Sequence, residues 1–386
     1  MSAIDHITAK EEIDSMTVDS FFEVLENQYN KQLPFVVYSR PINSIIKCWL
    51  QNDDQLHTTK DFLESGFVFA PFDLNNESIL LPEDQCEHFA VEINHLELDE
   101  NYGLSDTVNE SSLYHLDLVS KGIATIKYGD LEKVVLSRKV EKPLQSNRPI
   151  TIFKRLFNTY KKAMVYCWYH PKIGLWLGAT PELLFKVEGK RLTTISLAGT
   201  KPYSEDNQLP WTDKEYKEQQ IVTDYIKTQL APYTSQIKIS EVETVKAGHL
   251  LHLKTYILSL IKDDHSLKSI IETLHPTPAV CGFPKQKAKD FILNHEGYHR
   301  EYYTGFLGEL NLKQFKTRNT NRRNVENNAY SVVKMYSNFY VNLRCMQLKD
   351  DNAIIYVGGG ITKDSIPEKE WEETVNKTKT IVNVLS

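Results

Sequence analysis

The sequence has no long apolar run and no excess of positive charge, and each absence excludes a class of protein. No segment approaches the ~18 consecutive apolar residues that a membrane-spanning helix needs. The 51 acidic residues outnumber 45 lysines and arginines, and a net charge of −6 gives no general attraction to nucleic acid or anionic membrane. An anionic substrate would therefore need a local basic site.

Cysteine is also scarce, and its spacing shows no motif. The five cysteines are odd in number, widely spaced and free of any Cys-x-x-Cys pair, which indicates reduced thiols rather than disulfides or a zinc site. The first residues lack the basic and apolar regions of a signal peptide. We therefore expect a cytoplasmic protein with no membrane or nucleic-acid partner.

The length and composition are those of a folded protein with a large core. At ~150 residues per domain, a chain of 386 residues corresponds to two or three domains or to one large unit. The 41% hydrophobic and 25% charged contents are ordinary for a globular protein. We divide the chain into an amino-terminal α/β portion, residues 1–110, that packs on the core, and a catalytic region, residues 111–386.

Apolar periodicity predicts an α+β fold. Helices are predicted at 21–29, 113–128, 152–162, 214–230, 266–274, 285–294 and 368–385. Strands are predicted at 35–38, 45–50, 67–72, 133–140, 164–170, 175–178, 192–197, 237–245, 250–258, 339–348 and 353–357. Because strands cluster and are not each followed by a helix, we expect largely antiparallel sheets. We interpret the Asn-, Arg- and Lys-rich segment 311–328 as a solvated hairpin loop.

Two predicted helices begin with a pair of glutamates three residues apart. The pairs are Glu215 with Glu218 and Glu370 with Glu373. This spacing places both carboxylates on one helix face, and each helix also starts with a capping-box pattern, at 212–215 and 365–368. Two such pairs could hold a hard divalent cation. On spacing alone, solvated helix starts stabilised by the helix dipole are the simpler interpretation.

Two cationic residues lie on predicted strands. Alternation places Lys133 on one face of its strand, where partial burial would let the amine lose its proton and act as a general base. The alternative is an edge-strand lysine that prevents aggregation. Arg344, on the predicted strand 339–348, suits capture of a carboxylate through two hydrogen bonds, or a structural ion pair.

Three further segments could carry chemistry. Glu182 follows a predicted strand beside aliphatic residues, where burial would raise its pKa and suit it to general-acid work. The glycines 358–360 could bring backbone N–H groups close to an anion, or form a plain turn. From sequence alone, His252 is a hydrogen-bonded sheet histidine.

Together and in order, these segments resemble the motifs of the chorismate-utilising enzymes, a family that includes isochorismate, salicylate, anthranilate and aminodeoxychorismate synthases. The matching segments are KVVLSR at 133–138, ATPELL at 179–184, SLAGT at 196–200, KEYKE at 214–218, HLKT at 252–255, HPTPAVCG at 275–282, RC at 344–345, GGGI at 358–361 and EWEETVNK at 370–377. The resemblance covers roughly residues 111–386. It implies two antiparallel sheets packed as a central sandwich with helices outside.

The resemblance also implies a magnesium site. Glu218 and Glu373 would bind Mg²⁺, with Glu215 and Glu370 reaching it directly or through water. The metal would hold the ring carboxylate of the substrate, chorismate. Lys377, one helical turn after Glu373, would help to hold these carboxylates and the substrate. In relatives a basic residue and a histidine often neighbour the first acidic pair, whereas here the segment continues to a glutamine, which affects the tuning of metal affinity.

By the same resemblance, other residues would bind the substrate. Gly199 and the glycine run Gly358, Gly359 and Gly360 would offer backbone N–H groups to its carboxylates. Arg344, with Tyr303 as a candidate partner, would bind the enolpyruvyl carboxylate. His252 would position the ring near its C4 hydroxyl.

The activity that the resemblance favours is the conversion of chorismate to isochorismate, in which water adds at C2 while the C4 hydroxyl leaves. Glu182 would protonate the leaving hydroxyl and Lys133 would deprotonate the water. Ammonia-using relatives typically have Gln in place of Lys133, and aminodeoxychorismate synthases typically have a nucleophilic Lys in place of Ala198. Salicylate and anthranilate synthases tend to have Thr in place of Ala279.

Two other functions stay open from the sequence. One is a salicylate synthase, and the other is a non-catalytic chorismate-binding protein. Water as the nucleophile implies no glutaminase subunit. A monomer and a weak homodimer fit equally, and the product could feed menaquinone or catechol siderophore biosynthesis.

Overall fold

The computed structural model describes residues 16–97, 112–144, 148–202, 210–247, 250–263, 265–316 and 332–385. Their helices are α1 (Val18–Asn30), α2 (Leu113–Lys127), α3 (Pro149–Thr159), α4 (Asp213–Leu230), α5 (Leu267–Leu274), α6 (Lys285–His295) and α7 (Pro367–Val382). None of these helices is both long and apolar enough to cross a membrane. All five cysteines are free thiols.

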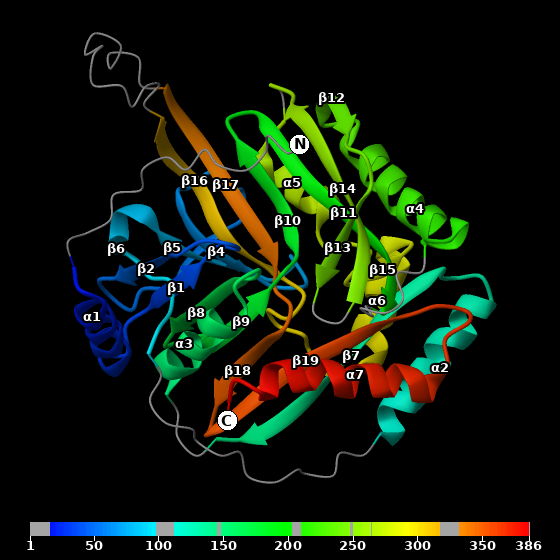
Figure 1. Cartoon of the computed structure of the whole chain (residues 1–386), viewed down its shortest axis with the longest axis horizontal. Helices are drawn as coiled ribbons and strands as arrows, with labels where there is room; N and C mark the ends of the chain where they lie inside the picture. The colour runs from blue at the N-terminus through cyan, green and yellow to red at the C-terminus, as the bar shows by residue number, and fades with distance from the viewer. Residues whose placement is uncertain are drawn as a thin grey trace.

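The strands form two large sheets (Figure 1). The nine-stranded sheet has the order β15 (Gly282–Phe283), β7 (Lys133–Pro143), β19 (Asn352–Ile361), β18 (Cys345–Lys349), β9 (Gly174–Thr180), β8 (Met164–His170), β1 (Phe35–Ser39), β2 (Ile45–Gln51) and β6 (Cys86–Glu92). The ten-stranded sheet has the order β12 (Thr234–Ile239), β14 (Leu250–Ile261), β11 (Arg191–Pro202), β10 (Leu183–Glu188), β17 (Val332–Val341), β16 (Phe306–Lys316), β4 (Gly66–Ala70), β5 (Ser78–Pro82) and β3 (His57–Thr59), with β13 (Glu243–Ala247) paired to β14.

Every strand pair in the described residues is antiparallel, as predicted. An aromatic core lies between the sheets, where Trp168 and Trp176 of one sheet pack with Phe69 of the other. Helices α1 and α3 cover the outer face of the nine-stranded sheet, and α4 and α5 pack on the other sheet. The predicted α+β sandwich with outer helices is confirmed.

The amino-terminal strands extend both sheets. Strand β1 pairs with β8, and β4 pairs with β16, so residues before 98 contribute an edge to each sheet. The division of the chain at residue 110 stays a prediction, because residues 98–111 lie outside the described residues.

Two predicted strands are wrong because the chain turns within them. The segment 237–245 forms β12 and β13, separated where the Ser240 hydroxyl accepts the backbone N–H of Tyr256. The segment 339–348 is interrupted after Asn342, whose backbone still bonds Thr304 and Gly305, because the chain then turns tightly and the Leu343 N–H bonds the Val341 carbonyl at 2.9 Å. Arg344 therefore lies in the turn between β17 and β18, with φ of 48°, and not on a strand.

Other corrections concern polar segments. The loop expected at 311–328 is wrong for residues 311–316, which continue β16 past a bulge and pair with β17; residues 317–328 lie outside the described residues. The capping box expected at 365–368 is also wrong. Helix α7 has Ile366 as its N-cap and starts at Pro367, whose fixed φ suits the first helical position. Strands β3, β5, β6, β10, β15 and β16 were not predicted.

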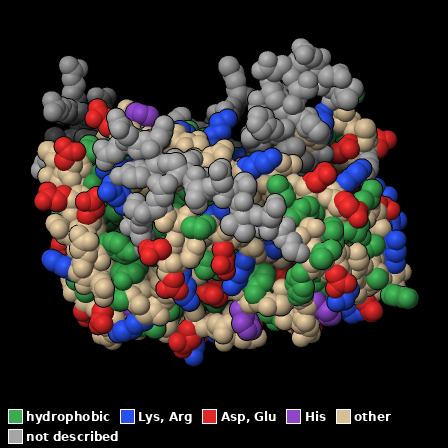
Figure 2. Space-filling model, turned by 90° about the horizontal axis from the view of Figure 1, so that it is seen from below, with side chains coloured by type: hydrophobic (Ala, Val, Ile, Leu, Met, Phe, Trp, Pro, Cys, Tyr) green, Lys and Arg blue, Asp and Glu red, His purple; other side chains and the backbone are tan. Residues whose placement is uncertain are grey.

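The surface agrees with the charge balance of the sequence. On the face shown in Figure 2, acidic and basic side chains of the described residues are interspersed. Such mixing leaves recognition of an anion to a local site rather than to the field of a whole face.

Candidate active site

Lys133 lies against the glycine run at the end of β19. Strands β7 and β19 are neighbours, with Gly360 opposite Val135 in the register. A Cβ atom at Gly360 would lie 2.9 Å from Cε of Lys133. Glycine at this position therefore leaves room for the lysine side chain across the strand end.

Helix α7 places its acidic face over the same glycines. A Cβ atom at Gly359 would lie 3.4 Å from Oε2 of Glu370 and 3.8 Å from Oε1 of Glu373. Nζ of Lys377 lies 2.7 Å from Oε1 of Glu373 and donates to the Gly358 carbonyl at 2.8 Å. The lysine thus ties α7 to β19, next to the predicted metal ligands.

Helix α4 brings the other acidic pair to β11. Gly199, with φ of 71°, forms a bulge in β11 that a residue with a side chain would strain. A Cβ atom there would lie 3.2 Å from Cβ of Glu215. The Glu215 carboxylate accepts the Thr212 N–H at 2.8 Å, which confirms the first predicted capping box.

Gln219 anchors this helix, a role that sequence reasoning missed. Its amide donates to the Ser196 carbonyl at 3.1 Å and to the Thr255 hydroxyl at 3.0 Å, and the side chain is buried. A polar residue on the apolar face of α4 was the available signal. Gln219 therefore ties α4 to β11 and β14, and the neighbouring Glu218 is exposed.

The charges around Lys133 connect both acidic helices. Burial lowers the pKa of Lys133, while the carboxylates of Glu182, Glu218 and Glu373 raise it and Lys377 lowers it. Groups from β7, α4, α7 and the β9–β10 connection thus act on one amine. A partly buried, neutral amine is the form that can accept a proton.

Glu182 has the opposite shift. Burial raises the pKa of its carboxyl group to about 7, against the influence of the Lys133 cation. Its backbone carbonyl accepts the Val341 N–H at 2.9 Å, which bonds the connection between β9 and β10 to the end of β17. Near neutral pH a substantial fraction of Glu182 therefore carries the proton that a general acid needs.

His252 is close enough to two basic side chains to feel their charge. It is on β14, opposite Thr200 of β11. Burial lowers its pKa, and the charges of Arg344 and Lys377 act in the same direction, which favours the neutral imidazole. Burial also lowers the pKa of Arg344. Arg344 and Lys377 are the basic side chains that an anionic substrate would require.

The remaining predicted residues lie in two loops. The ring of Tyr303 is buried and stacks on Tyr356 with centroids 5.4 Å apart. A Cβ atom at Gly358 would lie 3.0 Å from the Tyr303 hydroxyl oxygen, so this hydroxyl faces β19. A contact of Tyr303 with the enolpyruvyl group stays a prediction. Ala279 is exposed in the loop between α5 and β15.

The carboxylates are of the kind that a magnesium ion selects. Burial and the neighbouring Glu373 raise the pKa of Glu370, as expected of carboxylates that share one region. Within the described residues, however, no three His, Cys, Asp or Glu side chains already form a metal-binding group. The donor chemistry fits Mg²⁺, and the ligand set stays a prediction.

Comparison with known families identifies this arrangement. A family model described as chorismate binding enzyme matches residues 77–315, and a second model of the same description matches residues 331–383. The chain belongs to the chorismate binding enzymes. The family predicted from the ordered motifs is confirmed.

Curated relatives of this chorismate binding enzyme are isochorismate synthases. MenF of Pasteurella multocida is 30% identical over an alignment of 284 residues, and the match covers 69% of this chain and 60% of that enzyme. The salicylate biosynthesis isochorismate synthase of Pseudomonas aeruginosa is 29% identical over an alignment of 277 residues, and the match covers 69% of this chain and 54% of that enzyme. The matched part is thus less than two thirds of either relative.

Solved structures share the fold of this chorismate binding enzyme. The structure of MenF, the menaquinone-specific isochorismate synthase from Escherichia coli, has a TM-score of 0.76 at 21% identity and covers 97% of this chain and 92% of that one. A putative 2,3-dihydroxybenzoate-specific isochorismate synthase, DhbC from Bacillus anthracis, has a TM-score of 0.72 at 24% identity, covering 93% and 99%.

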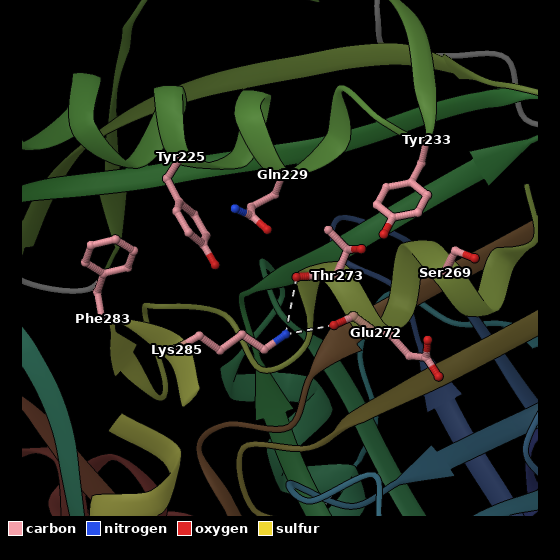
Figure 3. Close-up of a pocket in the computed structure, with 8 residues that line it drawn as sticks. All are labelled: Tyr225, Gln229, Tyr233, Ser269, Glu272, Thr273, Phe283 and Lys285. Atoms are coloured by element: carbon pink, nitrogen blue, oxygen red, sulfur yellow. Dashed lines mark hydrogen bonds between the residues drawn. The ribbon is translucent and has the colours of Figure 1, made fainter. Parts of the chain in front are cut away.

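A cavity of about 450 Å³ lies between α4, α5 and the start of α6 of this chorismate binding enzyme (Figure 3). It is lined by Tyr225, Gln229, Tyr233, Ser269, Glu272, Thr273, Phe283 and Lys285. Nζ of Lys285 donates to the carbonyls of Glu272 and Thr273, at 2.8 and 3.3 Å, and so caps the end of α5. None of the predicted site residues lines this cavity, although Phe283 pairs with Lys133 across the strands.

Proposed function

We propose that this chorismate binding enzyme is a Mg²⁺-dependent isochorismate synthase that converts chorismate reversibly to isochorismate. The observation that carries the proposal is the pairing of Lys133, whose pKa burial lowers, with Glu182, whose pKa burial raises to about 7. Each of these two groups influences the pKa of the other. One can serve as the base for the water that adds and the other as the acid for the hydroxyl that leaves. We place this chemistry in residues 111–386, with residues 1–110 as a portion packing on the core.

In the proposed reaction, Lys133 accepts a proton from the water that attacks C2 of the ring. Glu182 donates its proton to the C4 hydroxyl, which leaves as water as the ring double bonds shift. One water enters and one leaves, so substrate and product are isomers. The two groups exchange protonation states in each direction, as a reversible reaction requires.

The substrate is a dianion, and the basic side chains of the site support its binding. Arg344 would pair with the enolpyruvyl carboxylate, and the backbone of Gly199 and of glycines 358–360 would donate to the carboxylates. His252 would face the C4 hydroxyl. Lys377 holds Glu373 and the Gly358 carbonyl, so it orders the edge on which the ring carboxylate would lie.

Magnesium would be held by Glu218 and Glu373, with Glu215 and Glu370 binding it directly or through water. When bound, the ion supplies Lewis-acid polarisation of the ring carboxylate. The support for this assignment is the donor type, since hard divalent cations prefer carboxylate oxygens. The exposed positions of Glu218 and Glu373 leave their carboxylates accessible to an ion that retains water.

The names of similar proteins support a product used in either of two pathways. One is named menaquinone-specific, and another is a vibriobactin-specific isochorismate synthase of Vibrio cholerae, 28% identical over 275 residues. We propose a cytoplasmic enzyme, a monomer or weak homodimer, that delivers isochorismate to menaquinone or catechol siderophore synthesis. With water as the nucleophile, no glutaminase subunit is required.

Proton NMR of a mixture of the protein, chorismate and Mg²⁺ tests the proposal. We expect isochorismate to accumulate to a fixed ratio with chorismate, approached from either compound. A chelator such as EDTA should stop the conversion. Salicylate formed without an added lyase would instead show a salicylate synthase, and chorismate left unchanged would show a non-catalytic binding protein.

A further inference from the structure

A fully buried ion pair lies between α6 and β16, outside the residues that the proposed reaction uses. The side chains of Arg300 and Glu296 are 1% and 0% exposed. Nε of Arg300 donates to Oε2 of Glu296 at 2.7 Å, and Nη2 donates to Oε1, so the pair is bidentate. Such a fork fixes the relative orientation of both groups.

The remaining donors of Arg300 reach three other groups. Nη2 donates to the Val135 carbonyl at 2.7 Å, and Nη1 donates to the Val280 carbonyl at 2.9 Å and to the Thr304 hydroxyl at 3.2 Å. Every N–H of the guanidinium therefore has an acceptor in the protein. This side chain joins β7, the loop before β15 and the segment before β16.

Glu296 holds the same strand a second time. Its Oε1 accepts the backbone N–H of Ser137 at 2.8 Å and the Ser137 hydroxyl at 2.9 Å. Residues at odd positions of β7 share a face, so Val135 and Ser137 lie on the face that carries Lys133. The ion pair therefore forms hydrogen bonds to β7 at Val135 and Ser137, two and four residues after the proposed base.

The other segments that Arg300 joins also carry site residues. Val280 follows Ala279, the exposed residue of the loop before β15. Thr304 follows Tyr303, whose hydroxyl faces Gly358, and the Arg300 guanidinium lies 5.7 Å from the centre of the Tyr303 ring. One buried cation is thus bonded next to each of three parts of the site.

We propose that Arg300 and Glu296 are a positioning pair that sets Lys133 against the loop before β15 and the segment of Tyr303. The inference rests on the proposed function, since it concerns the reaction in which Lys133 is the base. Neither side chain touches the substrate, and both act through the backbone of β7. A displacement of ~1 Å in a catalytic group can cost ~100-fold in rate. Loss of the bonds from Arg300 and Glu296 should therefore lower kcat.

The alternative is a pair that only stabilises the fold. A stabilising pair would change the melting temperature but not the kcat of the molecules that stay folded. A positioning pair changes kcat more than KM, because Tyr303 lies beside Arg300 whereas Arg344 and Gly199, also proposed to bind carboxylates, lie on other segments.

Arg300→Lys separates these outcomes. Lysine keeps the charge beside Glu296, but its single nitrogen cannot reach the acceptors on three segments at once. The control is Arg40→Lys, in a second arginine–glutamate pair whose Glu309 is 2% exposed and whose Arg40 is 23% exposed. Arg40 donates from Nε to Oε2 of Glu309 at 3.0 Å, and that carboxylate otherwise contacts Tyr38, Tyr336 and Lys47, none of which is a predicted site residue.

Both variants should lower the melting temperature, but only Arg300→Lys should lower kcat per folded molecule, by about tenfold or more, with KM within about threefold. An unchanged kcat in Arg300→Lys, or an equal loss in Arg40→Lys, would overturn the positioning role. If the wild type forms no isochorismate, the proposed function falls and this role with it.

Ser137→Ala decides the question if Arg300→Lys does not fold. This variant removes the hydroxyl that bonds Glu296 and leaves the ion pair intact. A loss of about threefold in kcat at constant KM is expected, in the same direction as for Arg300→Lys. Wild-type kcat in a folded Ser137→Ala protein would then refute the proposal.

Discussion

At the residue scale, one physical cause prepares both proposed catalytic groups. Burial disfavours the charged form of any side chain, so it lowers the pKa of Lys133 and raises that of Glu182. The neutral amine and the protonated carboxyl group are the two forms that the reaction needs. Their mutual attraction opposes this effect, since it favours the charged pair.

The pH–rate profile should report this balance. The reactive state carries one proton on the pair, so kcat/KM should rise as the doubly protonated state disappears and fall as the last proton leaves. The fall on the alkaline side reports loss of the proton from Glu182 and should lie near the pKa of that group, about 7. In Glu182→Gln this limb should be absent from the residual activity, and a bell with both limbs would contradict the assignment.

Replacement of Lys133 should separate chemistry from binding. Lys133→Ala removes the base but leaves the groups that bind the substrate carboxylates. We expect turnover to fall at least ~100-fold, the lower range for loss of a general base. Chorismate affinity, measured by calorimetry, should stay within a few fold. Full activity in this variant would remove the proposed role of Lys133.

At the element scale, strand β19 shows why the site needs three consecutive glycines. Each of them faces a different group: Gly358 faces the hydroxyl of Tyr303, Gly359 the carboxylates of α7, and Gly360 the lysine of β7. A side chain on any of them would occupy space that a site residue fills. The run therefore serves close packing of side chains across a regular strand rather than a turn.

Gly360→Ala tests this packing. The new Cβ atom would lie 2.9 Å from Cε of Lys133, and this flexible side chain is its sole close neighbour among the described residues. The fold should persist while the amine moves, with a loss of ~10- to 100-fold in kcat. Gly359→Ala is the comparison, since its nearest atom would be 3.4 Å away, and its loss should be smaller.

The acidic helices predict a metal-affinity change. Glu218→Gln keeps the size of the side chain but removes a charge from the proposed ligand set, so apparent Mg²⁺ affinity should fall about tenfold or more. A Mg²⁺ titration of chorismate binding, monitored by calorimetry, measures this directly. Glu272→Gln, on α5 outside the site, should leave the affinity unchanged. Equal affinities in wild type and Glu218→Gln would count against the assignment.

The elements differ in how far sequence could predict them. All seven helices in the described residues were predicted because each spans at least two turns, enough for a helical period to show. Short strands such as β3 and β15 were not, since they lack enough residues for a periodic pattern. The break at Arg344 was missed because a non-glycine residue with φ of 48° and a tight turn at Leu343 leave no sign in the apolar alternation.

At the scale of the whole molecule, the site exists because distant segments meet at the edges of two sheets. Local patterns suggested Lys133, Glu182 and the two acidic pairs individually, but no spacing rule could join residues so far apart in the chain. The ordered resemblance joined them in a prediction, and the charges of Glu218 on α4 and Glu373 on α7 both raise the pKa of Lys133. The Arg300 pair escaped notice because burial alone distinguishes it from surface residues, whereas Gln219 could have been found from its place on the apolar face of α4.

The most direct test of the central claim, that Lys133 delivers water to C2, is a reaction in H₂¹⁸O stopped at low conversion. We predict isochorismate with one ¹⁸O at C2 and chorismate without label, read by mass spectrometry and by the isotope shift of the C2 carbon signal. Early quenching prevents the reverse reaction from labelling the substrate. Isochorismate without ¹⁸O would contradict water activation and the account built on it.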